Sequence, residues 1–130
     1  MNESILVSIK KLLGIEHDYT PFDTDITILI NSEFMTLTQL GVGPSEGFSI
    51  QDSSKTWADF LPDANETIRN AVKEYIYMKV KMIFDPPGNS YVMEAMKDRC
   101  AEYEQRLIMQ VESTKQFSFV NYENNPRIQC

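Results

Sequence analysis

The residues of this chain that most resemble a chemical site are a histidine and four carboxylates near the N-terminus. They are Glu16, His17, Asp18, Asp23 and Asp25. Such side chains can bind a divalent cation or transfer protons. A zinc site usually takes several nitrogen or sulfur ligands at regular spacing, and here no second histidine follows four residues after the first. The cluster is therefore interpreted as a polar loop followed by the acidic first turn of a helix, with no metal bound.

Sequence patterns of the common enzymes are missing as well. The chain contains no GxSxG, GxxxxGK[ST], HExxH or DxDxDG motif, and no spacing supports a Ser–His–Asp arrangement around His17. Residues 41–44, Gly-Val-Gly-Pro, do not form a phosphate-binding loop, because no strand is predicted before them and Pro44 has no amide donor. The sequence predicts neither an enzyme nor a cofactor site.

Composition indicates one small acidic domain. The chain has 130 residues, 42% hydrophobic and 11% aromatic, which is enough for a single core without a disulfide or a metal. Twelve basic residues oppose 19 acidic ones, and the net charge of −7 disfavours a protein that wraps nucleic acid. No apolar run reaches the roughly 20 residues of a membrane span, and the N-terminus does not resemble a secretory signal. Cys100 and Cys130 lack the spacing of a zinc or redox motif, so we expect two reduced thiols in a cytosolic protein.

Hydrophobic spacing predicts an all-α fold, a small bundle of about four helices. We expect these helices at residues 3–13, 20–40, 63–85 and 89–112. Thr20 is predicted as the N-cap of the second helix, and Asp63 is predicted to open a capping box at the third. A strand competes at residues 25–30, where β-branched residues partly alternate, but the helical period continues to Leu40 and favours a helix.

A long loop is predicted between the second and third helices, at residues 41–62. It holds three glycines and two prolines, and a short helix is expected within it at residues 55–61. Its aromatic residues, Phe48, Trp57 and Phe60, indicate that part of the loop packs down. A structured loop of this length in a compact domain is usually functional.

The third predicted helix carries four cations, which raises a second functional hypothesis. They are Arg69, Lys73, Lys79 and Lys81. A helix of this kind could contact phosphate, so the alternative function is a small helix-turn-helix DNA-binding protein or another intracellular interaction protein. The acidic net charge argues against it, and Glu66 and Glu74 suggest ordinary ion pairs along the helix.

The helical period ends before residues 113–130, which are predicted to form an extended arm separate from the helical domain of residues 1–112. Lys115, Arg127 and Glu123 give this arm a net charge of +1. Because the whole chain carries −7, the helical domain carries −8. The arm is too apolar for a solvated linker and is interpreted as a segment that docks on another surface. The alternative is that it folds back on its own bundle.

Several blocks of the chain, in one order, resemble a known family. The most specific are FDTDI at 22–26, LTQLGVGP at 37–44 and KVKMIFDPP at 79–87. Together with ILVSIKKLLGI at 5–15 and AMKDRCAEYEQRL at 95–107, they resemble the head–tail connector (adaptor) family of tailed bacteriophages and prophages. The similarity runs through nearly the whole predicted helical domain.

This resemblance implies a non-enzymatic structural protein of the virion, mainly helical and without a cofactor. Members of the family assemble as a ring, dodecameric in the virion, beneath the portal protein at the neck. The ring extends the DNA channel and receives a stopper, a head-completion protein or the tail. Assembly takes place in the host cytoplasm and involves no membrane. Viral DNA passes through the lumen without specific binding, and an acidic wall would repel its phosphates.

The resemblance also implies roles for three sets of residues. The C-terminal segment of the family helps to dock on the portal, which makes the docking candidates Phe117, Phe119, Val120, Tyr122 and Arg127. The long loop is expected to reach a neighbouring subunit or the next ring through Val42, Pro44, Phe48, Trp57 and Phe60. The candidates for charged contacts between subunits are Arg69, Lys73, Glu94, Asp98 and Glu102. Ion pairing within each helix explains these charges equally well.

Overall fold

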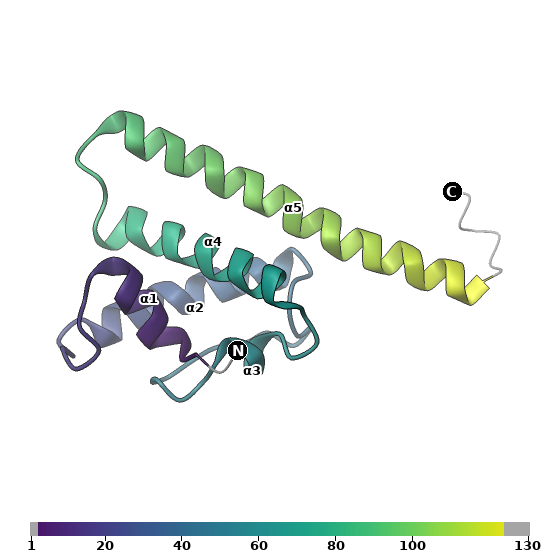
Figure 1. Cartoon of the computed structure of the whole chain (residues 1–130), viewed down its shortest axis with the longest axis horizontal. Coiled ribbons are helices and arrows are strands. Elements are labelled where there is room, and N and C mark those ends of the chain that lie inside the picture. Colours follow the sequence, from purple (N-terminus) through teal and green to yellow (C-terminus); the bar gives the residue numbers. More distant parts are fainter. Residues whose placement is uncertain (1–2, 124–130) are drawn as a thin grey trace.

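Figure 1 shows a computed structural model of the chain, which describes the backbone of residues 3–123 and the side chains of residues 3–112. Within these residues there are five helices and no β-sheet. The helices are α1 (Ile5–Leu13), α2 (Asp23–Gln39), α3 (Trp57–Phe60), α4 (Glu66–Phe84) and α5 (Ser90–Glu123). The prediction of a small all-α bundle is confirmed.

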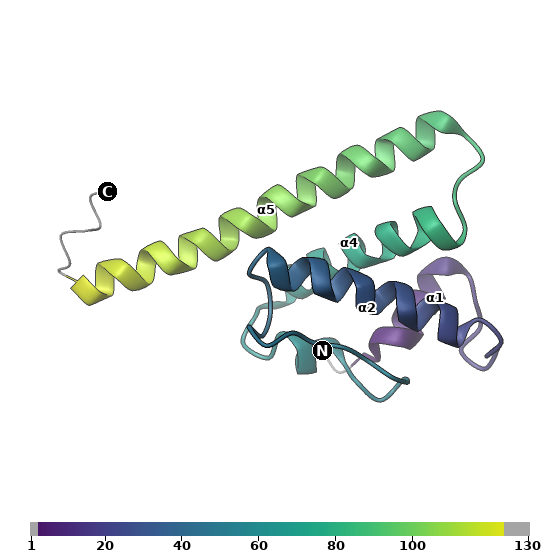
Figure 2. The same ribbon diagram turned by 180° about the vertical axis from the view of Figure 1, so that it is seen from behind.

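The central element of the bundle is α4. It packs against α1 and α2 on one side and against α5 on the other, as the two opposite views in Figures 1 and 2 show. Apolar residues three or four positions apart place one stripe of each helix toward this core. The fully buried stripe of α2, for example, consists of Ile26, Ile30, Phe34 and Leu37.

The loop between α2 and α4 packs down on the body. Asn31 of α2 holds it with two hydrogen bonds, because its Nδ2 donates to the Ile50 carbonyl at 2.9 Å and its Oδ1 accepts from the Ile50 amide at 2.8 Å. At Gly43 the backbone has φ +88°, and a Cβ there would lie only 2.5 Å from the Phe60 ring. Glycine is therefore required at this close approach.

The short helix α3 confirms the helix expected at residues 55–61. It begins with a capping box in which the Thr56 hydroxyl accepts from the Asp59 amide and the Asp59 carboxylate accepts from the Thr56 amide. Trp57 at its start is fully buried, and the indole Nε1 donates to Ser8 Oγ on α1 at 2.9 Å.

Two predicted helix starts were wrong. The cap of α2 is Phe22, with no side-chain hydrogen bond, so Thr20 is not its N-cap. The cap of α4 is Asn65, whose Oδ1 accepts from the Ile68 amide at 2.9 Å, so Asp63 opens no capping box. At α4 a second local N-cap residue, Asn65, takes the position that Asp63 was expected to hold, so the local pattern offered two starts and the wrong one was chosen.

The largest difference from prediction is the length of α5, which remains helical to Glu123 and does not end near residue 112. Residues 113–123 are therefore not an extended arm. The interval from Ser90 to Glu123 contains neither glycine nor proline, and the described residues contain no strand with which the alternating residues could pair. Figures 1 and 2 show this part of α5 projecting beyond the body. Residues 124–130, including Arg127, lie outside the described residues, and the division into a domain and a docking segment stays a prediction.

Candidate functional site

The loop that follows α1 brings together the acidic cluster found in the sequence. Possible ligand atoms of Glu16, His17 and Asp18 all lie within 4.8 Å of one another, and all three residues are exposed. Asp23 does not join them, because it pairs with Lys10. Exposed acidic groups of this kind are common without an ion, so the polar-loop interpretation stays a prediction.

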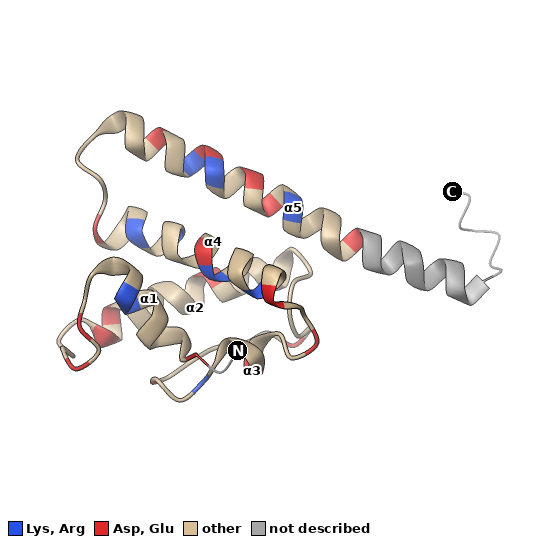
Figure 3. Ribbon diagram, viewed as in Figure 1, with Lys and Arg blue, Asp and Glu red and all other residues tan. Residues whose placement is uncertain are grey.

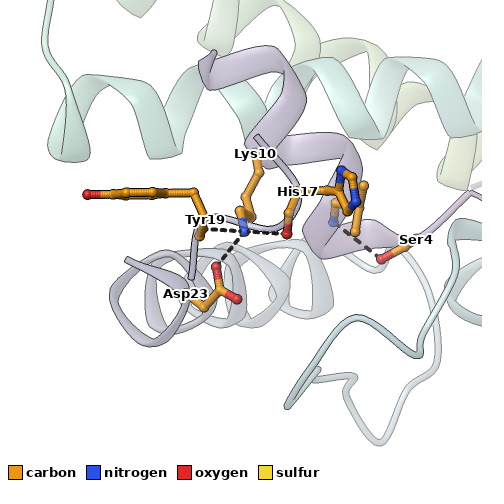
Figure 4. A network of polar contacts seen from close by, with 6 residues as sticks. Ser4, Lys10, His17, Tyr19 and Asp23 are labelled. Carbon is orange, nitrogen blue, oxygen red and sulfur yellow. Dashed lines mark hydrogen bonds and ion pairs between the residues drawn. The ribbon is translucent and has the colours of Figure 1, made fainter. Parts of the chain in front are cut away.

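Lys10 organises the connection between α1 and α2 (Figure 4). Its side chain is only 1% exposed, and Nζ donates to the carbonyls of His17 at 3.1 Å and Tyr19 at 2.8 Å. The same Nζ lies 2.8 Å from Asp23 Oδ1. Two hydrogen bonds and the ion pair with Asp23 offset the cost of burying the charge. The lysine beside the roughly 400 Å³ cavity between α1, α2 and the loop thus has a structural role.

A second polar cluster joins α2, α4 and α5. Tyr75 of α4 donates from its phenol to Glu104 Oε2 of α5 at 2.6 Å. Glu33 of α2 is buried, and burial raises the pKa of its carboxyl, while Lys79 opposes this rise and Glu104 adds to it. Burial likewise raises the pKa of the Cys100 thiol to about 11, so the thiol is protonated at neutral pH and is a poor nucleophile. The Tyr75–Glu104 hydrogen bond of this cluster joins α4 to α5.

The loop residues predicted to reach a neighbour lie mostly in the subunit's own core. Val42, Trp57 and Phe60 are buried, which corrects the expectation that their side chains are offered to another subunit. Phe48 is half-buried, with its ring 5.1 Å from that of Phe60. Pro44 is half-buried too. The loop packs down because the body supplies the aromatic partners and the Asn31 hydrogen bonds. A contact between this loop and a neighbour stays a prediction for its remaining surface.

The predicted charge candidates are mostly paired within the chain. Arg69 donates to the carbonyls of Leu61 and Pro62, both at 2.8 Å, and thereby fixes the loop to α4. Lys73 pairs with Glu3 at 3.0 Å.

On α5 the candidate carboxylates pair along the helix. Glu94 lies 3.5 Å from Lys97, and Glu102 lies 3.6 Å from Arg106. Asp98 is exposed. Surface pairs of this kind contribute little to stability, so these groups can exchange their partners for those of another molecule. Figure 3 shows the two signs of charge interleaved along this part of α5.

The sequence analysis missed an apolar groove where α5 leaves the body. The groove has a volume of about 330 Å³ and lies between the start of α4, the turn after α2 and the later part of α5. Its lining consists of Gly41, Val42, Gly43, Leu61, Ile68, Leu107, Gln110 and Val111. The sequence signal for it is the pair Leu107 and Val111, which lie about one helical turn apart within the fourth predicted helix.

Comparison with known proteins identifies a family. A family model described as "Phage connector protein" matches residues 5–114, which is nearly all of the body and the first part of α5 beyond it. No curated protein and no solved structure matches the chain. Within the residues that the structure describes, none of the helices has the length and apolar character that crossing a membrane requires.

Proposed function

Since the chain belongs to the phage connector protein family, we propose that it is a ring-forming subunit of the neck, placed beneath the portal protein. The ring would extend the DNA channel and provide the platform for a stopper, a head-completion protein or the tail. The single observation behind this proposal is the family match over residues 5–114. A structural role also agrees with a body whose buried polar groups serve packing. We propose no catalytic role.

Ring formation requires two different complementary faces on each subunit, because a closed ring is built from head-to-tail contacts. The chain offers distinct surfaces at opposite ends of the body. Tyr91, at the start of α5, is 86% exposed, and the apolar groove lies near the other end of the packed part of that helix. We propose that the ring contains twelve copies, which is the number that the family resemblance implies for the virion.

A DNA channel suits the charge of the chain better than DNA binding does. Residues 1–112 carry a net charge of −8, which repels phosphate and lets DNA slide. The helix-turn-helix alternative needs free cations on α4, yet Arg69 is bound to loop carbonyls and Lys73 to Glu3. Lys81 contacts Asp85 at 3.3 Å. The family and these contacts together favour the connector.

Residues 113–130 are proposed to attach the ring within the neck, with the portal as the partner that the resemblance implies. Their net charge of +1 and their five large apolar residues suit docking on another protein. The protein would then assemble in the host cytoplasm and remain in the virion.

The test is electron cryo-microscopy of necks from virions that contain this chain. We expect a closed ring of copies between the portal and the next protein, with an acidic inner wall. Absence of the chain from purified virions would overturn the proposal. A tight, salt-dependent affinity of the isolated protein for duplex DNA would favour the helix-turn-helix alternative.

A further inference from the structure

The apolar groove near the end of the body lacks a cover within the described part of the chain. Ile68 on α4 and Val111 on α5 form opposite sides of it and are half-buried. Met109, on the same stretch of α5, is 66% exposed. Apolar surface of this kind beside a hollow is typical of an interface with another protein.

We propose that this groove receives the α5 segment 113–123 of a second copy of the chain. The inference rests on the proposed function and specifies one contact within the ring. It assigns the helical part of the docking segment to a neighbouring copy. The residues that follow α5, with Arg127, keep the portal as their partner.

The segment cannot fill the groove of its own subunit. Leu107 and Val111 line the groove, and α5 remains helical from there to Glu123, so the segment points away from the groove along the same helix (Figures 1 and 2). At 1.5 Å per residue, the end of α5 lies about 18 Å beyond Val111 and about 24 Å beyond Leu107. Ile128 follows five residues later, and five extended residues span at most about 18 Å, so the tail of the same chain can reach no farther than the Val111 edge of the groove. A second copy, which has no such limit of reach, is the occupant that we propose.

The chemistry of the segment matches the groove. Phe117, Phe119, Val120 and Tyr122 make the segment strongly apolar, and Gln110 is the only polar side chain in the groove lining. With 3.6 residues per turn, Phe119 and Tyr122 share one face of α5 and Phe117 lies on the other, so two aromatic residues can bury roughly 300–500 Å² at 150–250 Å² each. That area is about half of the roughly 800 Å² per partner of a stable interface, so this contact is one part of the interface between copies. The net charge of +1 on residues 113–130 also complements the −8 of the body.

The proposed contact has the symmetry that a ring needs. The groove and the segment are different surfaces of one subunit, so the contact is heterologous, and each copy offers both halves to two different neighbours. Two copies can satisfy it only by exchanging their segments reciprocally about a twofold axis. One-way repetition of the contact leads instead to a closed ring or an open filament.

The experiment is photo-crosslinking in the full-length chain, with p-benzoyl-phenylalanine in place of Phe119. Chains with ordinary and with heavy nitrogen are mixed at the highest concentration at which they stay soluble, and cross-linked peptides are identified by mass spectrometry. Mixed-isotope products mark contacts between copies. We expect such products to join position 119 to peptides that contain Leu61, Ile68 or Leu107–Val111.

Two matched substitutions test whether the groove is the acceptor. Ile68→Glu, combined in the same chain with the cross-linker, places a charge in the groove and should reduce the yield of mixed products by about tenfold or more. Ile28→Glu is the control, because Ile28 is 60% exposed on α2 and is not a groove residue, and its yield should stay unchanged. Circular dichroism of both variants verifies that the helices remain.

The inference would be overturned if no mixed-isotope products formed, or if they joined position 119 to surfaces other than the groove. Equal yields for Ile68→Glu and Ile28→Glu would also overturn it. A virion neck in which a ring of this chain has residues 113–123 seated on the portal would overturn the inference and leave the proposed function intact. If the cross-links to the groove form but the chain is missing from the virion, the inference stands and the proposed function is overturned.

Discussion

The phenol of Tyr75 on α4 donates a 2.6 Å hydrogen bond to Oε2 of Glu104 on α5, across two helices joined by a proline-containing turn. Tyr75 is fully buried and Glu104 is half-buried. The carboxylate also raises the pKa of the phenol, after burial as the larger cause, so the phenol remains a donor at every ordinary pH. This bond is a specific polar tie between α5 and the rest of the body.

Replacement of Tyr75 by phenylalanine should therefore loosen the attachment of α5. A hydrogen bond to a charged acceptor contributes about 1.5–3 kcal/mol, and the partial exposure of Glu104 favours the lower end of this range. We expect a loss of about 1–2 kcal/mol in the free energy of unfolding, measured by urea titration. Tyr103→Phe is the control, since the Tyr103 hydroxyl accepts from Arg99 at 3.3 Å in an exposed pair and should change stability by less than about 0.5 kcal/mol. Equal effects of the two variants would contradict this role of Tyr75.

Glu33→Gln should stabilise the protein near neutral pH and lose this effect in acid. Burial raises the pKa of Glu33 from 4.5, so the folded state binds this proton more tightly than the unfolded state. Stability of the wild type therefore falls as pH rises through the interval above 4.5, and glutamine does not titrate. The melting temperature of the variant should exceed that of the wild type at about pH 8, and the difference should shrink toward pH 4.5. Attraction to Lys79 limits the gain. A difference independent of pH would contradict the assignment.

Lys10→Met should be strongly destabilising, because it leaves Asp23 and two loop carbonyls without their buried donor. Breaking a buried ion pair costs about 3–5 kcal/mol, and the 30% exposure of the Asp23 side chain reduces this to about 2–4 kcal/mol. Lys11→Met provides the control, as Lys11 is exposed on the same helix and its replacement should have an effect within about 0.5 kcal/mol. Urea unfolding of both variants measures the difference. Similar stabilities would mean that the network does not hold the loop.

Gly43→Ala should destabilise the protein more than Gly47→Ala. Both glycines have positive φ, +88° and +97°, so each substitution carries a backbone cost of about 1–2 kcal/mol. At Gly43 the new Cβ would also lie 2.5 Å from the Phe60 ring, whereas at Gly47 nothing lies within 4 Å. Overpacking adds about 1–3 kcal/mol at Gly43 alone. Equal losses in melting experiments would show that the ring moves aside freely.

Local sequence patterns were sufficient for most of the helices. Apolar residues at helical spacing identified α1, α2 and α4, and aromatic residues near Thr56 identified α3. These features depend on residues within one or two turns of each other, which a sequence displays directly. The end of α5 was predicted too early. A weak alternating pattern was given more weight than the fact that no helix-breaking residue occurs before Pro126.

The candidate surfaces were harder to predict, because they depend on residues far apart in the chain. Trp57 was expected to pack down, but no local pattern identified its partner Ser8, 49 residues away. The groove combines a turn after α2 with Ile68 and Leu107. No periodicity indicates such a meeting of three segments, and neither the apolar C-terminal segment nor the family resemblance located this surface.

Hydrogen exchange should distinguish two parts of α5 in the isolated chain. Cys100 and Leu107 are buried against the body, so amides from residue 96 to 111 should be well protected. Beyond them the helix projects without a neighbouring element in the described chain, and eleven isolated residues form only a marginal helix in water. Amides of residues 113–123 should therefore exchange much faster, by at least about a hundredfold, and become protected when the assembled connector forms. Strong protection of residues 116–122 in a verified monomer would mean that the segment is already packed on its own subunit, and its role in docking would then have to be abandoned.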